Sequence, residues 1–215
     1  MKWRHNLFND RWAIEDVWRG MRGGFFIEAG AVNGLNGSAT YVLEHDFGWT
    51  GICVEAIDHF YDAIPKFRNC KRDNRALYSE SGLMLDFAQL EDQSGQSGLT
   101  AKLRKEARNM IASTPEKVTV VPKQTVTLSD LLREHDAPEL IHYLCLDVEG
   151  AELEVLRVFD FSGPYKILSA SIEGKRGAWI MKHFGYVPVV NPYSSADFEF
   201  YFLHPDIDRY RDVGA

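Results

Sequence analysis

The fold of this chain is decided by one short stretch, FFIEAGAVNGLNG at residues 25–37. Its first part, Phe25 to Ala29, is mostly apolar and predicts a buried strand, and the glycines at positions 30, 34 and 37 predict a turn. Residues 38–45 then have the pattern of a helix. A strand that leads through a glycine-rich turn into a helix places backbone N–H groups at the carboxyl edge of a sheet, where open α/β folds bind ligands. The stretch therefore predicts a ligand site.

The rest of the chain continues the alternation of strands and helices. Strands are predicted at residues 51–55, 75–77, 83–87, 141–148, 167–173, 186–190 and 198–203. Helices are predicted at residues 58–67, 103–111, 128–135, 151–159 and 175–184. This order is typical of a parallel sheet with helices on both faces, although the last two strands, joined through Asn191-Pro192, are expected to pair antiparallel. Neither a repeat nor a linker is evident, so we expect a single α/β domain over residues 1–215.

Composition limits the classes of function. Of 215 residues, 45% are hydrophobic, and 31 acidic residues exceed 24 basic ones. The hydrophobic share suffices for a globular core, and the acidic excess argues against nucleic acid as a partner, because phosphate binding needs a basic surface. No stretch approaches the ~18 apolar residues of a membrane span and no secretory signal is recognised, so we expect a cytoplasmic protein without a membrane partner. A homo-oligomer is compatible with the sequence.

The chain has three cysteines, Cys53, Cys70 and Cys145, and no two of them form a CxxC pair. This spacing argues against a zinc ribbon and against a redox dithiol. Two of the three lie in apolar stretches that are predicted to be buried strands.

The spacing of the glycines restricts the ligand. A dinucleotide-binding turn needs G-x-G-x-x-G, but Val32 stands where the second glycine would be, and no G-x-x-x-x-G-K-[ST] motif for a nucleoside triphosphate occurs. Glu28 is expected at the mouth of the turn, where it would repel a pyrophosphate and attract the ammonium group of an amino acid. Glu55 ends the second strand, where a carboxylate can accept hydrogen bonds from ribose hydroxyls. S-adenosylmethionine meets these conditions; the alternative is a plain turn with two exposed carboxylates.

Five segments of the chain carry a family resemblance. They are residues 26–38, 48–55, 74–79 and 127–132 and, most specific of all, LCLDVEGAE at residues 144–152. With these motifs the chain resembles the FkbM-type methyltransferases over residues 24–204, with residues 1–23 as an N-terminal helical extension. The resemblance implies a catalytic core with a class I, Rossmann-like sheet of about seven strands, mostly parallel, with a C-terminal antiparallel hairpin. It also implies S-adenosylmethionine as cofactor and O-methylation of a small molecule or glycan.

The turn and the resemblance together assign a candidate cofactor site. We expect it to contain Glu28, Gly30, Ala31, Asn33, Gly34, Ser38, Glu55, Ala56, Ala76 and Asp147. The chain departs from the usual family pattern at Val32-Asn33, where the family more often has a small or polar residue followed by an acidic one. This departure leaves the contacts to the methionine part of the cofactor open.

Carboxylates gather where the apolar strand at residues 141–148 meets the next helix. Asp147, Glu149 and Glu152 lie there, and Glu173 ends the following strand. O-methylation needs an aligned hydroxyl whose proton is removed or whose oxyanion is stabilised, so a carboxylate could serve as base, or two could hold a magnesium or manganese ion. We predict Asp147, Glu149 and Glu173 as catalytic residues and leave the metal requirement open. The alternative for Glu149 and Glu152, which lie three residues apart at the start of the helix, is that they simply interact favourably with the helix dipole.

Four further features have a structural explanation that competes with a functional one. The polar segment 91–98 is either a lid over the site or a plain surface loop. The basic residues of segment 102–108 are expected on a solvated helix face. The helix at residues 14–21 is expected to pack onto its own domain rather than cover the acceptor site or contact another subunit. His45 and His183 are expected at the surface or in packing contacts rather than in the site.

Two rival functions stay open. The first is another nucleotide-using enzyme, such as an NAD-dependent oxidoreductase, which the missing glycine at Val32 disfavours and cofactor binding would test. The second is a non-catalytic binding module that retains the fold. The presence of Glu28, Glu55 and Asp147 disfavours it, whereas binding of S-adenosylhomocysteine without turnover would favour it.

Overall fold

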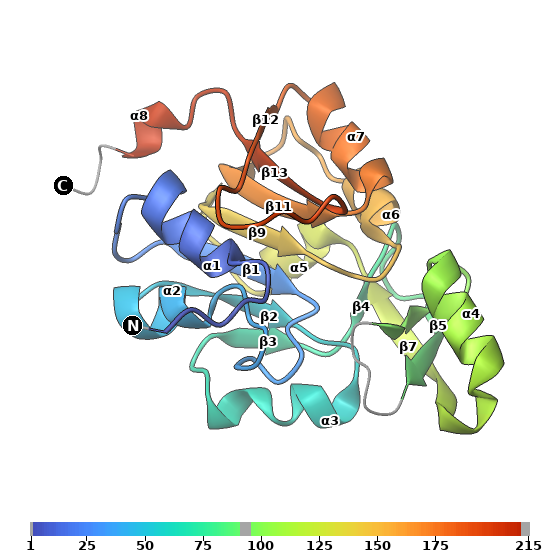
Figure 1. Cartoon of the computed structure of the whole chain (residues 1–215). Coiled ribbons are helices and arrows are strands. Elements are labelled where there is room, and N and C mark those ends of the chain that lie inside the picture. The colour runs from blue at the N-terminus through green and yellow to red at the C-terminus, as the bar shows by residue number, and fades with distance from the viewer. Residues whose placement is uncertain (1, 91–95, 212–215) are drawn as a thin grey trace.

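The computed structural model describes residues 2–90 and 96–211. Its main feature is a sheet of seven strands in the order β12-β13-β11-β9-β1-β2-β3 (Figure 1). These strands are β1 (Phe25–Ala29), β2 (Thr50–Val54), β3 (Lys71–Asp73), β9 (Tyr143–Leu146), β11 (Ser169–Glu173), β12 (Val187–Val189) and β13 (Glu199–Leu203). Within this sheet the neighbouring strands β11, β9, β1, β2 and β3 pair in parallel, whereas β13 is antiparallel to both of its neighbours. The chain order reverses between β1 and β9, and α/β sheets bind ligands in the crevice at such a switch point.

The strand β1 explains why the centre of the sheet is apolar on both faces. All five of its residues are buried. Phe25, Ile27 and Ala29 contact one core and Phe26 contacts the other, so the strand has the continuous apolar run of a parallel strand that is covered on both sides. The predicted bounds of this strand are confirmed.

Helices cover both faces of the sheet, as expected (Figure 1). Three helices contribute to the core on the side of Ile27: α5 (Leu128–Glu134), α6 (Glu152–Leu156) and α7 (Lys175–His183). Three others lie on the side of Phe26: α1 (Asn9–Arg11), the π-helix η1 (Trp12–Val17) and α2 (Tyr41–Phe47). The segment after β2, predicted as one helix at residues 58–67, forms two short helices instead: α3 (Asp58–Tyr61) and the 3-10 helix η2 (Ile64–Lys66), which has Pro65 in its first turn.

The N-terminal helix packs onto the sheet, as expected. The indole rings of Trp12 and Trp18 are buried in the same core as Phe26. The side-chain amide of Asn9 donates to Glu199 Oε1 at 2.9 Å and to an Oγ on the neighbouring strand β11 at 3.2 Å. Apolar burial and hydrogen bonds therefore both attach this segment to the sheet.

A second, smaller sheet projects from one side of the molecule (Figure 1). In the order β4-β7-β5-β6 it contains β4 (Ala76–Leu77), β7 (Val118–Val126), β5 (Met84–Leu90) and β6 (Gly98–Leu99). Two helices join β6 to β7: α4 (Lys105–Ser113) and η4 (Pro115–Lys117). The sequence predicted β4 and most of β5 but missed β7, because Pro122 interrupts its pattern and a proline normally argues against a strand.

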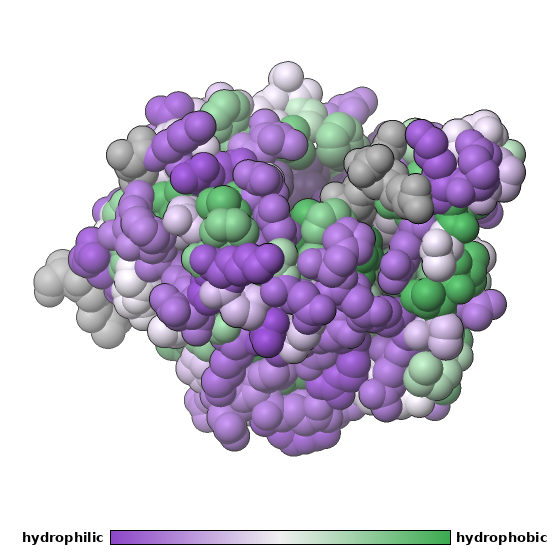
Figure 2. All heavy atoms as spheres, turned by 90° about the horizontal axis from the view of Figure 1, so that it is seen from below, coloured by the Kyte–Doolittle hydropathy of each residue, from purple (hydrophilic) through white to green (hydrophobic). Residues whose placement is uncertain are grey.

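The surface of the molecule seen from below is mostly hydrophilic (Figure 2). A hydrophobic patch lies on the right, at the end of the molecule that carries β5 and β7 in Figure 1. Met84 on β5 and Val120 on β7 are exposed apolar residues at this end. Within residues 2–90 and 96–211, none of the helices combines the length and the apolar character needed to cross a bilayer.

Several elements near the site are shorter than the sequence predicted. The strand predicted at residues 141–148 is divided into β8 (Leu140–Ile141) and β9, because β8 pairs with β10 (Lys166–Ile167) instead of the main sheet. The strand β9 ends at Leu146, so Asp147 begins the following loop. The helix predicted at residues 151–159 is reduced to α6, and a last short helix, α8 (Asp208–Arg211), follows the sheet.

Candidate active site

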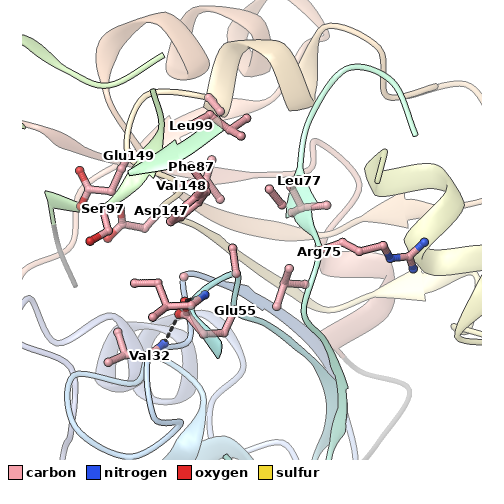
Figure 3. A pocket seen from close by; sticks show the side chains of 16 residues that line it. Val32, Glu55, Arg75, Leu77, Phe87, Ser97, Leu99, Asp147, Val148 and Glu149 are labelled. Atoms are coloured by element: carbon pink, nitrogen blue, oxygen red, sulfur yellow. Dashed lines mark hydrogen bonds between the residues drawn. The ribbon is translucent and has the colours of Figure 1, made fainter. Parts of the chain in front are cut away.

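A pocket opens at the carboxyl ends of β1, β2 and β9, where the chain order reverses. The space between its walls is about 650 Å³, part of which is open solvent. The lining residues are Gly30, Val32, Val54, Glu55, Ala56, Ile57, Arg75, Ala76, Leu77, Phe87, Ser97, Leu99, Asp147, Val148, Glu149 and Ala151. In Figure 3, Glu55 lies on one side of the pocket, Phe87 and Glu149 lie across from it, and the side chain of Arg75 points away.

Gly30 allows the glycine turn to lie against the loop after β9. Its φ is 84°, and a Cβ atom here would overlap the carbonyl oxygen of Asp147. Val32 also has a positive φ, 48°, so the turn is tight. Glycine is therefore required at position 30 by the close approach of two backbone segments in the pocket wall.

Glu55 is held in the pocket by backbone groups. The residue is 5% exposed, and its carboxylate accepts hydrogen bonds from the N–H groups of Val32 and Ile57, both at 2.8 Å (Figure 3 shows the first). Burial raises the pKa of Glu55 to about 7, although the two hydrogen bonds oppose the shift. Each oxygen has a second lone pair with which to accept a further hydrogen bond, as a ribose hydroxyl would require.

Glu28 does not lie at the mouth of the turn, contrary to the prediction. The residue is 2% exposed and does not line the pocket, because its side chain points to the opposite face of β1 from Ala29. Its carboxylate accepts hydrogen bonds from the Ser38 hydroxyl at 2.9 Å and the Thr40 hydroxyl at 2.6 Å. Arg68 Nη1 lies 3.3 Å from Glu28 Oε2. The buried carboxylate therefore connects the turn to a buried guanidinium and has a structural role.

The predicted cofactor residues fall into two groups. Those that line the pocket are Gly30, Glu55, Ala56, Ala76 and Asp147. Those that do not are Glu28, Ala31, Asn33, Gly34 and Ser38. The second group stabilises the turn: the Asn33 side chain accepts from the backbone N–H groups of two following residues, and Gly34 packs against Arg68. The prediction took the whole glycine turn as ligand-contacting, but only its first part reaches the pocket.

Sequence reasoning also missed the apolar wall of the pocket. Phe87 and Leu99 come from the small sheet, on β5 and β6, and pack with Ala56 and Ala76 in one core. Phe87 was predicted to be in a strand, but nothing in the sequence indicated that this strand folds over the end of β2. Of the predicted lid at residues 91–98, positions 91–95 lie outside the described residues, and Ser97 lines the pocket.

Three carboxylates meet at the end of the pocket away from Glu55, as predicted. One oxygen of each of Asp147, Glu149 and Glu173 can be chosen so that all three lie within 4.8 Å of one another. Burial, and then the interaction with Glu173, raise the pKa of Asp147 well above its ordinary value. Burial and the charge of Glu173 raise the pKa of Glu149 to about 8. The pKa of Glu173 is lowered: burial would raise this pKa, but hydrogen bonds from Asp147 and from a nearby arginine outweigh the effect of burial.

That arginine is Arg104, which the sequence placed wrongly on a solvated helix face. It immediately precedes α4, and its guanidinium contacts Glu173, Glu152 at 2.8 Å and Glu149 at 3.8 Å. Burial opposes its charge, but the hydrogen bond to Glu173 and the surrounding carboxylates raise the pKa of Arg104 above its usual value. Arg104 is the counterion of the acidic cluster, and its neighbours in sequence carry no signal that distinguishes it from them.

Glu152 does more than interact with a helix dipole. It is 4% exposed, and its Oε1 accepts hydrogen bonds from the N–H groups of Val148 at 3.2 Å and Gly150 at 3.1 Å. Glu149, between them, has a φ of 54°, which is uncommon for a residue other than glycine. Glu152 and Arg104 thus hold the loop that presents Glu149 to the pocket.

The acidic cluster has the donor set of a divalent-cation site. Asp147 Oδ1 and Glu173 Oε2 are buried and have no hydrogen-bond partner among the described residues. Carboxylate oxygens are the ligands that Mg²⁺ and Mn²⁺ prefer, so these residues fit such an ion. The two histidines remain outside the site, as expected: His45 contacts Asp46 on the surface, and His183 stacks on Trp179.

A mostly parallel sheet with its pocket and its acidic groups at the carboxyl ends of the central strands defines a ligand-binding α/β enzyme. Comparison of the sequence with known protein families identifies the family within this class of enzymes. The profile of the methyltransferase FkbM domain matches residues 28–181, and the chain belongs to this methyltransferase family. The resemblance that the motifs predicted is therefore confirmed. The search of curated proteins found no match.

Proposed function

We propose that the protein is an S-adenosylmethionine-dependent methyltransferase that methylates a hydroxyl oxygen of a small molecule or glycan. The observation that carries this proposal is a single pocket with carboxylates on two opposite sides. Glu55 lies at one end, and Asp147 and Glu149 lie across from it. Family membership supports methyl transfer, and the strand order with an antiparallel β13 supports a class I, Rossmann-like methyltransferase core formed by residues 24–204 of a single domain.

The pocket suits the two ends of this cofactor. Phe87, Leu99 and Leu77 provide an apolar wall for an adenine ring, and Glu55 can accept hydrogen bonds from the ribose hydroxyls. Asp147 follows β9 and lies against the glycine turn, which places its carboxyl group at the part of the pocket where we propose that the sulfonium lies. When bound, the cofactor supplies an electrophilic methyl group. The residues of the chain bind and orient it and manage the proton of the acceptor.

The acidic cluster is proposed to remove that proton. Glu149 lines the pocket, and its pKa of about 8 makes it an effective base near neutral pH. Asp147 and Glu173 behind it can share a proton or hold a cation. A magnesium or manganese ion, if bound, would be held by Asp147, Glu149 and Glu173 and would acidify the acceptor hydroxyl. Arg104 keeps the carboxylates together in either case.

Two measurements test the proposal. Calorimetry with S-adenosylhomocysteine and, separately, with NAD⁺ is expected to show binding of the first and not of the second. A screen of hydroxylated small molecules and glycans with methyl-labelled S-adenosylmethionine is then expected to find a labelled ether product. Binding of NAD⁺ alone would favour an oxidoreductase, and binding of S-adenosylhomocysteine without transfer to any acceptor would favour a binding module.

A further inference from the structure

The fold brings together two cysteines that are far apart in sequence. Cys53 lies in β2, and Cys70 immediately precedes β3. Because β2 and β3 pair in parallel, with Cys53 opposite Arg72, the two thiols lie side by side, and their Sγ atoms are 3.4 Å apart. All three cysteines are free thiols. The absence of a CxxC motif therefore did not exclude a dithiol, because the pairing of β2 with β3 brings together two cysteines that are far apart in the sequence.

The two thiols differ in access to solvent. Cys53 is fully buried, whereas Cys70 is only partly buried and lines a hollow at the amino ends of β1 and β2, with Thr50 and Gly51. This hollow lies at the opposite edge of the sheet from the proposed cofactor pocket. A small solute can therefore reach Cys70 from outside and cannot reach Cys53 directly.

Charged groups around the pair can assist thiol chemistry. The Arg68 guanidinium interacts electrostatically with both sulfurs. The Cys53 thiol donates to Glu28 Oε2 at 3.9 Å. The hydrogen bond with Cys70, together with burial, raises the pKa of Cys53 well above its ordinary value, so Cys53 keeps its proton until it reacts.

We propose that Cys53 and Cys70 form a peroxide-sensitive thiol pair that closes to a reversible disulfide. A peroxide oxidises the Cys70 thiolate to a sulfenic acid, and the peroxide O–O bond breaks with loss of one oxygen as hydroxide or alkoxide. Cys53 sulfur then attacks Cys70 sulfur, the S–O bond breaks, and the S–S bond forms. The Cys53 proton passes to Glu28 or to the departing hydroxide, which leaves as water. Each sulfur loses one electron, and the peroxide accepts both.

The geometry requires only a small movement. A disulfide has an S–S length of ~2.05 Å, so the sulfurs at 3.4 Å must approach each other by about 1.3 Å. Among the described strands, β3 lies at the edge of the main sheet and pairs only with β2. Cys145 is placed differently: it lies on β9, on the other side of β1 from Cys53.

The test treats the protein, residues 1–215, with hydrogen peroxide and follows its intact mass and its peptide map. We expect the loss of two hydrogen atoms, a crosslink between the peptides of Cys53 and Cys70, and recovery of both thiols with dithiothreitol. The rate should not depend on protein concentration, because the bond forms within one chain. The matched control Cys145→Ser should form the same crosslink, and Cys70→Ser should form none.

A second variant identifies the intermediate. In Cys53→Ser the sulfenic acid on Cys70 has no partner, so we expect dimedone to label Cys70. Two intact thiols after peroxide treatment that oxidises glutathione completely would overturn the proposal, and so would a crosslink to Cys145 or between two chains. If Cys53→Ser does not fold, the peptide map of the unmodified sequence decides alone. No cofactor or acceptor enters the experiment, so its outcome is independent of the proposed methyl transfer.

Discussion

Two sets of buried carboxylates lie near the same glycine turn and differ in how their oxygens are satisfied. Glu28 has a donor on each oxygen: the Ala39 N–H binds Oε1, and two hydroxyls and Arg68 contact Oε2. In the acidic cluster, by contrast, Asp147 Oδ1 and Glu173 Oε2 have no partner among the described residues. A buried polar atom without a partner costs free energy and is retained where a ligand uses it. Glu28, which is fully hydrogen-bonded and does not line the pocket, therefore has a structural role, whereas the unpartnered oxygens beside the pocket support a functional role for the acidic cluster.

The largest expected effect is on catalysis by the unsatisfied cluster. Asp147→Asn removes the titratable carboxyl group and keeps the size, and we expect the rate of methyl transfer to fall ~10²–10⁴-fold. Stability should be kept, because the Asn amide can donate to Glu173 as a protonated Asp147 does. Rates and urea unfolding should be compared with those of Asp62→Asn, an exposed control. Full activity in Asp147→Asn would remove Asp147 from the mechanism.

A chelator distinguishes whether the acidic cluster acts as a base or as a cation site. If the carboxylates act only as a base, activity persists in EDTA; if they hold a cation, activity is lost and Mg²⁺ or Mn²⁺ restores it.

The next effect concerns the backbone between the two sets. Gly30→Val should abolish binding of S-adenosylhomocysteine and lower the free energy of unfolding by about 3 kcal/mol, because the side chain overlaps the Asp147 carbonyl. Gly37→Ala is the matched control. Its φ is also positive, 73°, but a Cβ there meets no atom within 4 Å, so only a loss of ~1 kcal/mol is expected. Normal binding by Gly30→Val would show that the turn is merely a connector.

The satisfied carboxylate should matter for stability. Glu28→Gln leaves the buried Arg68 with Glu44 as its remaining acidic partner, 2.6 Å away, and we expect a loss of about 3 kcal/mol in urea unfolding. The exposed Glu116→Gln should cause almost none. An equally small effect at both positions would show that the Glu28 network does not stabilise the fold.

The smallest expected effect, taken per pH unit, is the dependence of stability on pH. The pKa of Glu149 is raised to about 8 and that of Glu55 to about 7, so the native state binds more protons than the unfolded state above their ordinary pKa of 4.5. The stability contributed by these groups is complete below pH 4.5 and is lost as pH rises to about 8. Denaturation at several pH values should show a slope reduced by up to ~1.4 kcal/mol per pH unit in Glu149→Gln. An unchanged slope would contradict the raised pKa.

Sequence reasoning reached the parts of the structure that local patterns determine. The continuous apolar run of β1, the acidic end of β2 and the carboxylates after β9 follow from strand periodicity and strand ends. It failed where long-range placement decides. Strand alternation determines which face of β1 carries Glu28, but the sequence does not show which face borders the pocket. Arg104 contacts the acidic cluster only because the small sheet folds over the loop after β9. Phe87 and the pairing of Cys53 with Cys70 were missed for the same reason.

The most direct test of the proposed cofactor site is calorimetry of S-adenosylhomocysteine with Glu55→Ala, which changes a carboxylate that lines the pocket, and with Glu28→Gln, which changes one that does not, each beside the unchanged protein. Hydrogen bonds to a charged acceptor are worth ~1.5–3 kcal/mol, so Glu55→Ala should weaken binding by roughly 10- to 150-fold. Glu28→Gln should bind with nearly unchanged affinity once the folded fraction is taken into account. Unchanged affinity in Glu55→Ala, or an equal loss in Glu28→Gln, would contradict the account.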